Sequence, residues 1–174
     1  MKRLALALFI AGMVAVFLLG CEKDDICPED SVTTPLLVIT FHDRNDSEAR
    51  KEVSFLSVIG KDQDAPITGI DSIATDSIAI PLKVFENESV FAFTRHTEEI
   101  SESGDTLRIN NADTLTFQYQ TEQIFISRAC GFVTNFSGLT AIRDQADTNR
   151  WISSLEVINP TVENQSAAHV KIYH

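Results

Sequence analysis

Three cysteines and four histidines are the residues of this 174-residue chain that could most readily form a covalent bond or bind a metal ion. The histidines, which lack the short His-Glu-x-x-His spacing that places two rings on one metal, are His42, His96, His169 and His174. The sequence has no Gly-x-Ser-x-Gly elbow, no Ser-x-x-Lys pair and no glycine-rich phosphate loop. We therefore predict a protein that is not an enzyme and that needs no metal or other cofactor.

The first twenty residues have the pattern of a secretory signal. Lys2 and Arg3 precede an uncharged apolar run over residues 4–20, which is slightly short for a helix that crosses hydrocarbon. The run ends in Leu-Leu-Gly before Cys21, which resembles the lipobox cut by lipoprotein signal peptidase. We predict that residues 1–20 are removed and that Cys21 becomes the lipid-bearing first residue. A plain signal peptide or an uncleaved helix is the alternative.

Residues 21–34 are polar, lack a periodic apolar pattern and are predicted to form a lipidated tether. The run Glu22-Lys23-Asp24-Asp25 resembles the surface-export signal of Bacteroidota lipoproteins. Two or three acyl chains hold a protein stably on a bilayer, so the membrane is a predicted partner. The expected location is the outer membrane with the domain on the cell surface. The alternative is an ordinary charged tether on the periplasmic face.

With Cys21 used for lipid, Cys27 and Cys130 remain as an even pair. Such a pair in an oxidising compartment predicts a disulfide, here between the tether and a late strand. The competing interpretation is a reactive Cys130 thiol, although no nearby histidine is evident in the sequence that would lower its pKa.

Asp followed by Ser or Thr and then an aliphatic residue occurs five times, at residues 30–32, 71–73, 76–78, 105–107 and 113–115. This pattern resembles the acceptor for protein O-glycosylation in Bacteroidota. The candidate acceptors are Ser72, Ser77, Thr106 and Thr114, and we favour Ser72 or Ser77 because their segment is predicted to be an exposed loop. The alternative is that Asp-Ser and Asp-Thr simply begin strands after turns.

From Leu36 onward apolar residues recur with a period of two, which is typical of half-buried strands. The alternating sets include Val53, Phe55, Ser57 and Ile59; Ile78, Ile80, Leu82 and Val84; Phe91 and Phe93; Leu107 and Ile109; Leu115, Phe117 and Tyr119; Ile124 and Ile126; Trp151, Ser153, Leu155 and Val157; and Val170 and Ile172. No segment has a helical stripe over three turns. Residues 43–52 are predicted to be a loop or one short helical turn.

Turn residues separate these runs. Ser-Gly-Asp at 103–105 and Asn-Asn-Ala-Asp at 110–113 predict tight turns, with a hairpin formed by the runs around 105–110 and 113–120. Pro81 within a strand pattern indicates an edge or a bulge. Nine or ten short strands over residues 35–174 predict an all-β fold, a single β-sandwich of the Ig-like, Greek-key type. A small β-barrel is the alternative.

The chain carries a net charge of −11, with 25 acidic and 14 basic residues. Phosphate binding requires a basic stripe, and the sequence has none, so nucleic acid is not a predicted partner.

The layout is similar to a family of uncharacterised Bacteroidota lipoproteins, small β-rich domains known only as a domain of unknown function. The residues that carry the resemblance are Cys27-Pro28-Glu29, Thr34-Pro35-Leu36-Leu37-Val38-Ile39, Ile126-Ser127-Arg128-Ala129-Cys130-Gly131-Phe132 and His169-Val170-Lys171-Ile172-Tyr173. The resemblance supports the predicted cellular location and the predicted fold, and it implies no activity.

The functional prediction is a noncatalytic accessory or interaction module, lipid-anchored in the envelope, whose partner is an outer-membrane protein. The first alternative is a surface carbohydrate-binding lipoprotein that stacks a glycan on Trp151 or Tyr119, although both follow strand periodicity and are expected in the core. The second is an envelope enzyme whose site is assembled from residues distant in sequence.

Overall fold

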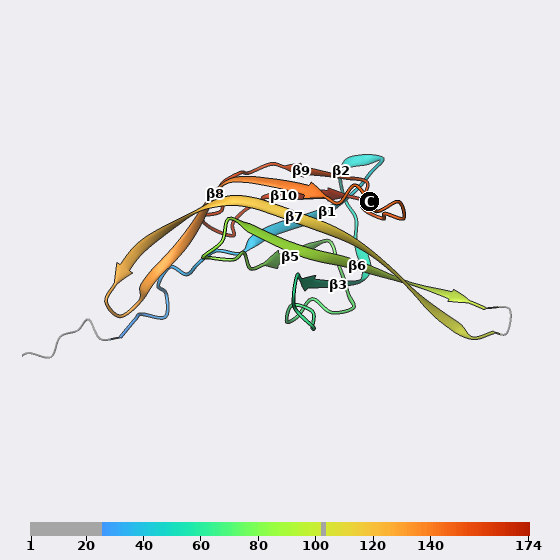
Figure 1. Cartoon of the computed structure of the whole chain (residues 1–174), viewed down its shortest axis with the longest axis horizontal. Coiled ribbons are helices and arrows are strands. Elements are labelled where there is room, and N and C mark those ends of the chain that lie inside the picture. Colours follow the sequence, from blue (N-terminus) through green and yellow to red (C-terminus); the bar gives the residue numbers. More distant parts are fainter. Residues whose placement is uncertain (1–25, 102–103) are drawn as a thin grey trace, which may run out of the picture. The chain divides into compact units, whose positions relative to one another are not determined.

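The computed structural model describes residues 26–101 and 104–174, which fold into ten β-strands joined by turns and loops, with no helix among them (Figure 1). The strands are β1 (Leu37–Asp43), β2 (Asp46–Arg50), β3 (Val53–Gly60), β4 (Ile73–Thr75), β5 (Ser77–Ile80), β6 (Glu88–Ile100), β7 (Thr106–Ser127), β8 (Gly131–Arg143), β9 (Ser154–Val157) and β10 (Val170–Tyr173). The all-β prediction is confirmed.

The strands form two sheets of five. In the first, the order is β2-β1-β10-β9, and β5 also pairs with β1. Here β1 and β10, almost the first and last strands in the chain, run parallel, whereas the other pairs are antiparallel. The second sheet has the order β4-β3-β6-β7-β8, and consecutive hairpins join its last three strands. This two-sheet, sandwich-like arrangement confirms the predicted fold class, and the closed-barrel alternative does not apply.

One hydrophobic core lies between inner faces contributed by both sheets. Its fully buried members from the first sheet include Leu37, Ile39 and Phe41, and Phe93 and Phe117 come from the second. Alternation predicted most of these faces correctly, since residues two apart on a strand share a face. Each large apolar side chain removed from water in this way contributes about 1.5–3 kcal/mol.

Strand β3 departs from the predicted alternation. Phe55 adopts a left-handed backbone conformation with φ of 52° and is 38% exposed, and the register with β4 shifts between Val53 and Leu56. The extra residue of a bulge reverses the faces of the residues that follow it. Leu56 and Val58 consequently enter the core, and Ser57 lies on the opposite face from the one expected.

The predicted hairpin with a turn at 110–113 is wrong, because these residues lie inside the 22-residue strand β7. The turn instead joins β6 to β7, where Gly104 has φ of 87° and its N–H donates to the Ser101 carbonyl at 2.9 Å. β6 pairs with β3 only as far as Arg95, whereas its pairing with β7 continues to Ile100. Strands β6 and β7 are therefore longer than the sequence predicted.

Two smaller predictions also differ from the structure. Residues 43–52, predicted to be a loop or helical turn, contain β2, a mostly exposed strand paired with the end of β1. Its charged sequence gives no apolar alternation because it faces solvent. Pro81 lies directly after β5, where a residue without an N–H ends the pairing with β1.

The described residues divide into two compact units. The smaller unit consists of residues 26–32 and 125–132, which include the end of β7, the start of β8 and the turn between them. The larger unit contains the rest of the two sheets.

Candidate functional site

The predicted disulfide is present: Cys27 and Cys130 are bonded, with their Cα atoms 4.9 Å apart. Cys130 lies in the turn between β7 and β8 and not in a strand, and its N–H donates to Ser127 Oγ at 3.0 Å. Gly131, with φ of 70°, completes the turn in a conformation that glycine adopts without strain. Because Cys130 is oxidised, it has no thiol to act as a nucleophile.

The predicted lipidation site Cys21 and the signal at residues 1–20 lie outside the described residues. Within the described part of the chain, no helix is long and apolar enough to cross a membrane.

The candidate glycosylation sites differ in accessibility. Thr106 is exposed at the start of β7, whereas Thr114 is half-buried in the same strand. Ser77 lies half-buried in β5, and Ser72 is half-buried with its N–H bonded to Ser57 Oγ at 2.9 Å. The expectation that Ser72 and Ser77 share an exposed loop is therefore wrong, because backbone pairing places much of that segment in β4 and β5.

Trp151 and Tyr119 are in the core, as their periodicity predicted. Trp151 is 6% exposed, its indole N–H donates to the Phe93 carbonyl at 3.0 Å, and the Arg95 guanidinium lies 5.5 Å from the ring centre. The Tyr119 ring packs edge-on against Phe136 with the ring centres 5.1 Å apart. Neither ring is available as a platform on which a sugar could stack.

Asp113, whose sequence context suggested a turn, is fully buried and holds the backbone near Trp151. Its Oδ2 accepts hydrogen bonds from the N–H groups of Trp151 and Ile152, at 3.1 and 2.6 Å. Burial raises the pKa of Asp113, the bond from the Ile152 N–H opposes that increase, and the nearby carboxylate of Asp147 adds to it. Asp113 therefore serves as a cap for a distant loop and not as a turn former.

A polar cluster that no sequence motif predicts is formed by Ser57, Asp71, His96 and Asn110. Ser57 Oγ lies 2.8 Å from Asp71 Oδ1 and 3.3 Å from His96 Nε2, and it accepts a bond from the Ser72 N–H. His96 Nδ1 lies 2.6 Å from Asn110 Oδ1. Because an amide oxygen only accepts, the Nδ1 of His96 carries a proton in this contact.

Contacts connect Ser57 to His96 and His96 to Asn110. Some enzymes arrange a nucleophile, a base and a group that orients the base in the same order. However, Ser57 has one hydroxyl proton, and the closer acceptor is Asp71. The residue is also only 4% exposed, so a substrate has no access to its oxygen. The cluster fixes the segment before β4 against β3 and β6.

The buried histidines are also engaged in structural contacts. His169 Nδ1 accepts a bond from the Val38 N–H at 3.0 Å, and burial lowers the pKa of this ring. His42 Nε2 lies 3.0 Å from Thr40 Oγ1, and burial likewise lowers the pKa of His174. Among the described residues, no group of three or more His, Cys, Asp or Glu side chains is arranged to hold a metal ion.

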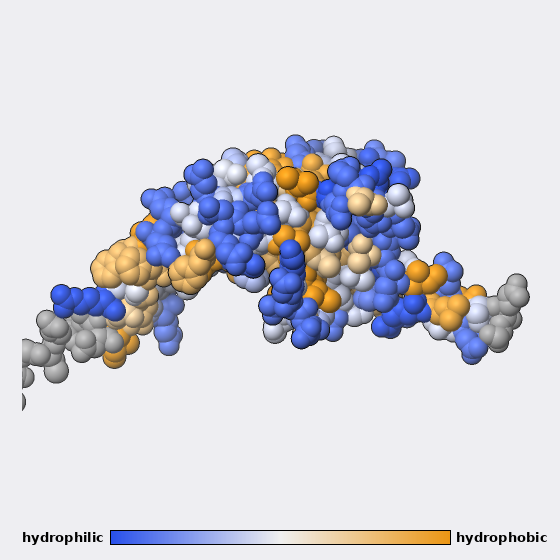
Figure 2. Space-filling view, in the orientation of Figure 1, coloured by the Kyte–Doolittle hydropathy of each residue, from blue (hydrophilic) through white to orange (hydrophobic). Residues whose placement is uncertain are grey.

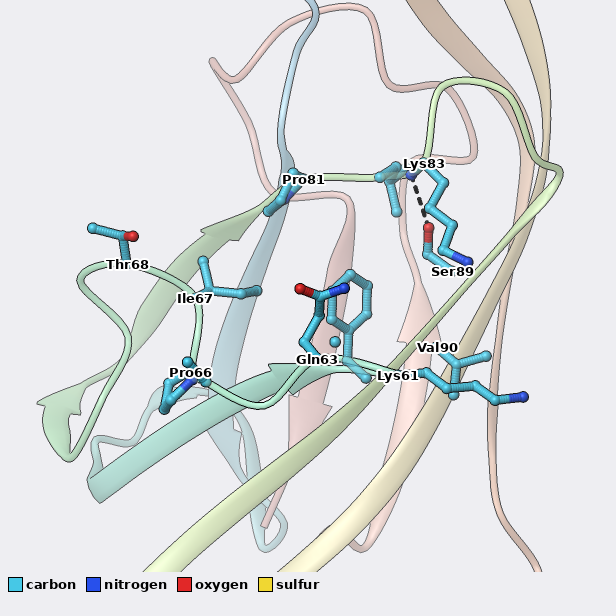
Figure 3. A pocket seen from close by; sticks show the side chains of 13 residues that line it. Lys61, Gln63, Pro66, Ile67, Thr68, Pro81, Lys83, Ser89 and Val90 are labelled. Carbon is cyan, nitrogen blue, oxygen red and sulfur yellow. Dashed lines mark hydrogen bonds between the residues drawn. The ribbon is translucent and has the colours of Figure 1, made fainter.

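A cavity of about 400 Å³ lies between the loop that follows β3 and the segment that follows β5 (Figure 3). Its apolar walls are formed by Pro66, Ile67, Pro81, Leu82 and Phe91. The side chains of Gln63 and Ile67 point from the loop toward the space that Pro81 borders (Figure 3). The volume lies within the range of about 300–1,000 Å³ that is usual for ligand pockets.

Two of the polar side chains around the cavity, those of Lys83 and Ser89, have protein partners. Lys83 forms an ion pair with Glu86 at 2.9 Å, and this hydrogen bond raises the pKa of Lys83. Ser89 Oγ accepts from the Lys83 N–H at 2.9 Å and lies 2.6 Å from Tyr119 Oη, which itself donates to the Lys83 carbonyl. Ser89 therefore donates its hydroxyl proton to Tyr119 Oη. The side chain of Lys61 points away from the cavity centre (Figure 3). The apolar part of the cavity wall can contact an apolar group.

Comparison with protein families finds a match to a family of unknown function (DUF6452) over residues 55–174. The match includes both the cavity and Cys130, but it begins after Cys27. Searches of curated proteins and of solved structures find no match. Because the matched segment is more than half of the chain, this protein belongs to the DUF6452 family of unknown function.

Proposed function

We propose that this protein is a noncatalytic binding module, lipid-anchored in the outer membrane and displayed on the cell surface, whose cavity receives an apolar group of a protein partner. The observation that carries the proposal is the open cavity with walls of Pro66, Ile67, Pro81, Leu82 and Phe91. Its Lys83 and Ser89 side chains are engaged in internal contacts, and much of the remaining wall is apolar, which favours binding of an apolar group.

Export supports the anchoring part of the proposal. The disulfide between Cys27 and Cys130 needs an oxidising compartment, which agrees with a secretory signal at residues 1–20. The lipobox-like end of that signal places the lipid on Cys21, and the Lys-Asp-Asp run that follows it supports Bacteroidota-type surface export.

Replacement of Cys21 by serine tests the anchor. We expect wild-type protein, grown with an alkyne fatty acid, to carry the label and to sediment with membranes. Cys21→Ser should lose the label completely, because the hydroxyl does not replace the thiol as lipid acceptor. The double variant Cys27→Ser/Cys130→Ser is the control and should keep the label. An unlabelled wild-type protein contradicts the anchor.

Filling the cavity tests the binding part. Ala65 lines the cavity and is exposed, so Ala65→Trp can place an indole in it without displacing the core. The matched control is Ala167→Trp, at an alanine that is also exposed but does not line the cavity. We expect a protein that co-purifies stoichiometrically from gently solubilised membranes to fall by at least about tenfold with Ala65→Trp only, because the indole occupies the space the partner needs. Equal recovery with both variants would exclude the cavity as the binding site.

A further inference from the structure

We propose that the turn between β7 and β8, with Phe125 and Phe132 beside it, inserts into the lipid surface to which the protein is anchored. The inference rests on the proposed lipid anchor at Cys21. It adds a second membrane contact, made by the folded chain, and thereby assigns the face of the smaller unit that meets the bilayer.

The smaller unit contributes no residue to the hydrophobic core, and it exposes several large apolar side chains. Phe125 is 56% exposed and Phe132 is 61% exposed, although their rings contact each other edge-on with centres 5.3 Å apart. Ile26 and Val32 of the same unit are 82% and 62% exposed. Figure 2 shows hydrophobic residues gathered at this end of the β7–β8 hairpin. Isolated exposed apolar side chains are ordinary, but four in one small unit indicate an interaction surface.

The disulfide holds this surface close to the anchor. Cys27 follows Cys21 by six positions, and an extended chain of that length spans at most about 22 Å. The Cα atom of Cys130 lies 4.9 Å from that of Cys27, and Phe132 follows two residues later. Without the disulfide, a longer tether would separate the lipid from the hairpin. The covalent path therefore favours lipid as the occupant of this surface.

The charges of the unit identify the kind of lipid contact. Its described charged residues are Glu29, Asp30 and Arg128, which give no cluster of basic side chains. Binding through anionic headgroups needs such a cluster. Contact with the bilayer is therefore made by the phenyl rings entering the interfacial region, and it does not depend on anionic lipid.

Fluorescence quenching tests this directly on the full-length protein, processed in cells and reconstituted into phosphatidylcholine vesicles. The chain has one tryptophan, Trp151, which is buried and supplies a constant background. In Phe125→Trp, we expect lipids with brominated acyl chains to quench roughly half or more of the added emission, since interfacial apolar groups reach about 5–10 Å into the headgroup and acyl boundary. Phe132→Trp provides the same test at the second ring.

The matched control is Leu107→Trp, which introduces an indole at a similarly exposed position, at the opposite end of β7. Its added emission should not be quenched. Adding anionic lipid should leave the Phe125→Trp result unchanged, and Cys27→Ser/Cys130→Ser in that background should reduce the quenching. Intact mass reports acylation of Cys21 in each sample. An acylated protein without quenching at both ring positions overturns this inference alone, whereas an unacylated protein overturns the anchor and this inference with it.

Discussion

Replacing Asp113 with alanine is expected to lower the free energy of unfolding by roughly 2–4 kcal/mol, because two buried N–H donors lose their acceptor. The carboxylate is fully buried, and its Oδ2 accepts from the backbone of both Trp151 and Ile152. Trp151 packs on Phe41 and donates to the Phe93 carbonyl, so displacement of its loop would disturb the core between the sheets. Urea denaturation of wild type and Asp113→Ala measures the loss.

Asp113→Asn is the matched control. The amide oxygen can still accept both N–H bonds, and its NH₂ group can face Asp147, so this variant should stay within about 1 kcal/mol of wild type at neutral pH. If Asp113→Ala is as stable as Asp113→Asn, the capping role is wrong.

The difference in stability between wild type and Asp113→Asn is expected to depend on pH. Burial raises the pKa of Asp113 above its unfolded value, so the folded protein binds the proton more tightly than the unfolded chain. The contribution of Asp113 to stability therefore increases as pH falls through the folded pKa and decreases as pH rises. Wild type should gain stability relative to Asp113→Asn when the pH is lowered from 7 toward 4.

Removal of the disulfide is expected to have the second large effect. Cys27 and Cys130 are 103 residues apart in sequence, and closing a loop of that length restricts the unfolded chain by about 3–5 kcal/mol. We expect Cys27→Ser/Cys130→Ser to unfold at a lower denaturant concentration by that amount. A reducing agent should lower the stability of wild type and leave the double variant unchanged.

The location of the bond makes this prediction specific. The disulfide lies in the smaller unit, formed by residues 26–32 and 125–132, so its removal takes no side chain from the hydrophobic core. The near-ultraviolet spectrum of the core aromatics should therefore be preserved in the double variant. A loss below about 1 kcal/mol, with the bond verified in wild type, would contradict chain closure as the source of stability.

Some features of the sequence were misleading because the same residue types have two uses. Asn110 and Asp113 are typical turn formers, yet they lie in β7, where one binds the His96 ring and the other caps Trp151 and Ile152. Short polar side chains satisfy backbone or side-chain groups that can be distant in sequence. Local composition therefore could not distinguish a turn from a strand at this position.

The cavity and the Ser57 cluster could not be found by motif for a related reason. Their members come from separate strands and loops, and only strand pairing brings them together. Ser57 meets His96 because β3 pairs with β6, and its face follows from the bulge at Phe55. The cavity forms where the loop after β3 approaches Pro81 and Leu82. No regular spacing of residues in the sequence indicates that these segments lie close together.

The sequence by itself determined most of the strand-forming segments and the cysteine pairing, and it predicts the export signal and the lipid on Cys21. Alternation requires only neighbouring residues, and with Cys21 assigned to lipid only one cysteine pair remains. The tertiary structure decided the sheet order, the parallel pairing of β1 with β10, the face reversal in β3 and the cavity. These features depend on contacts between residues far apart in the chain, whose free energy is gained only when both sheets close on one core.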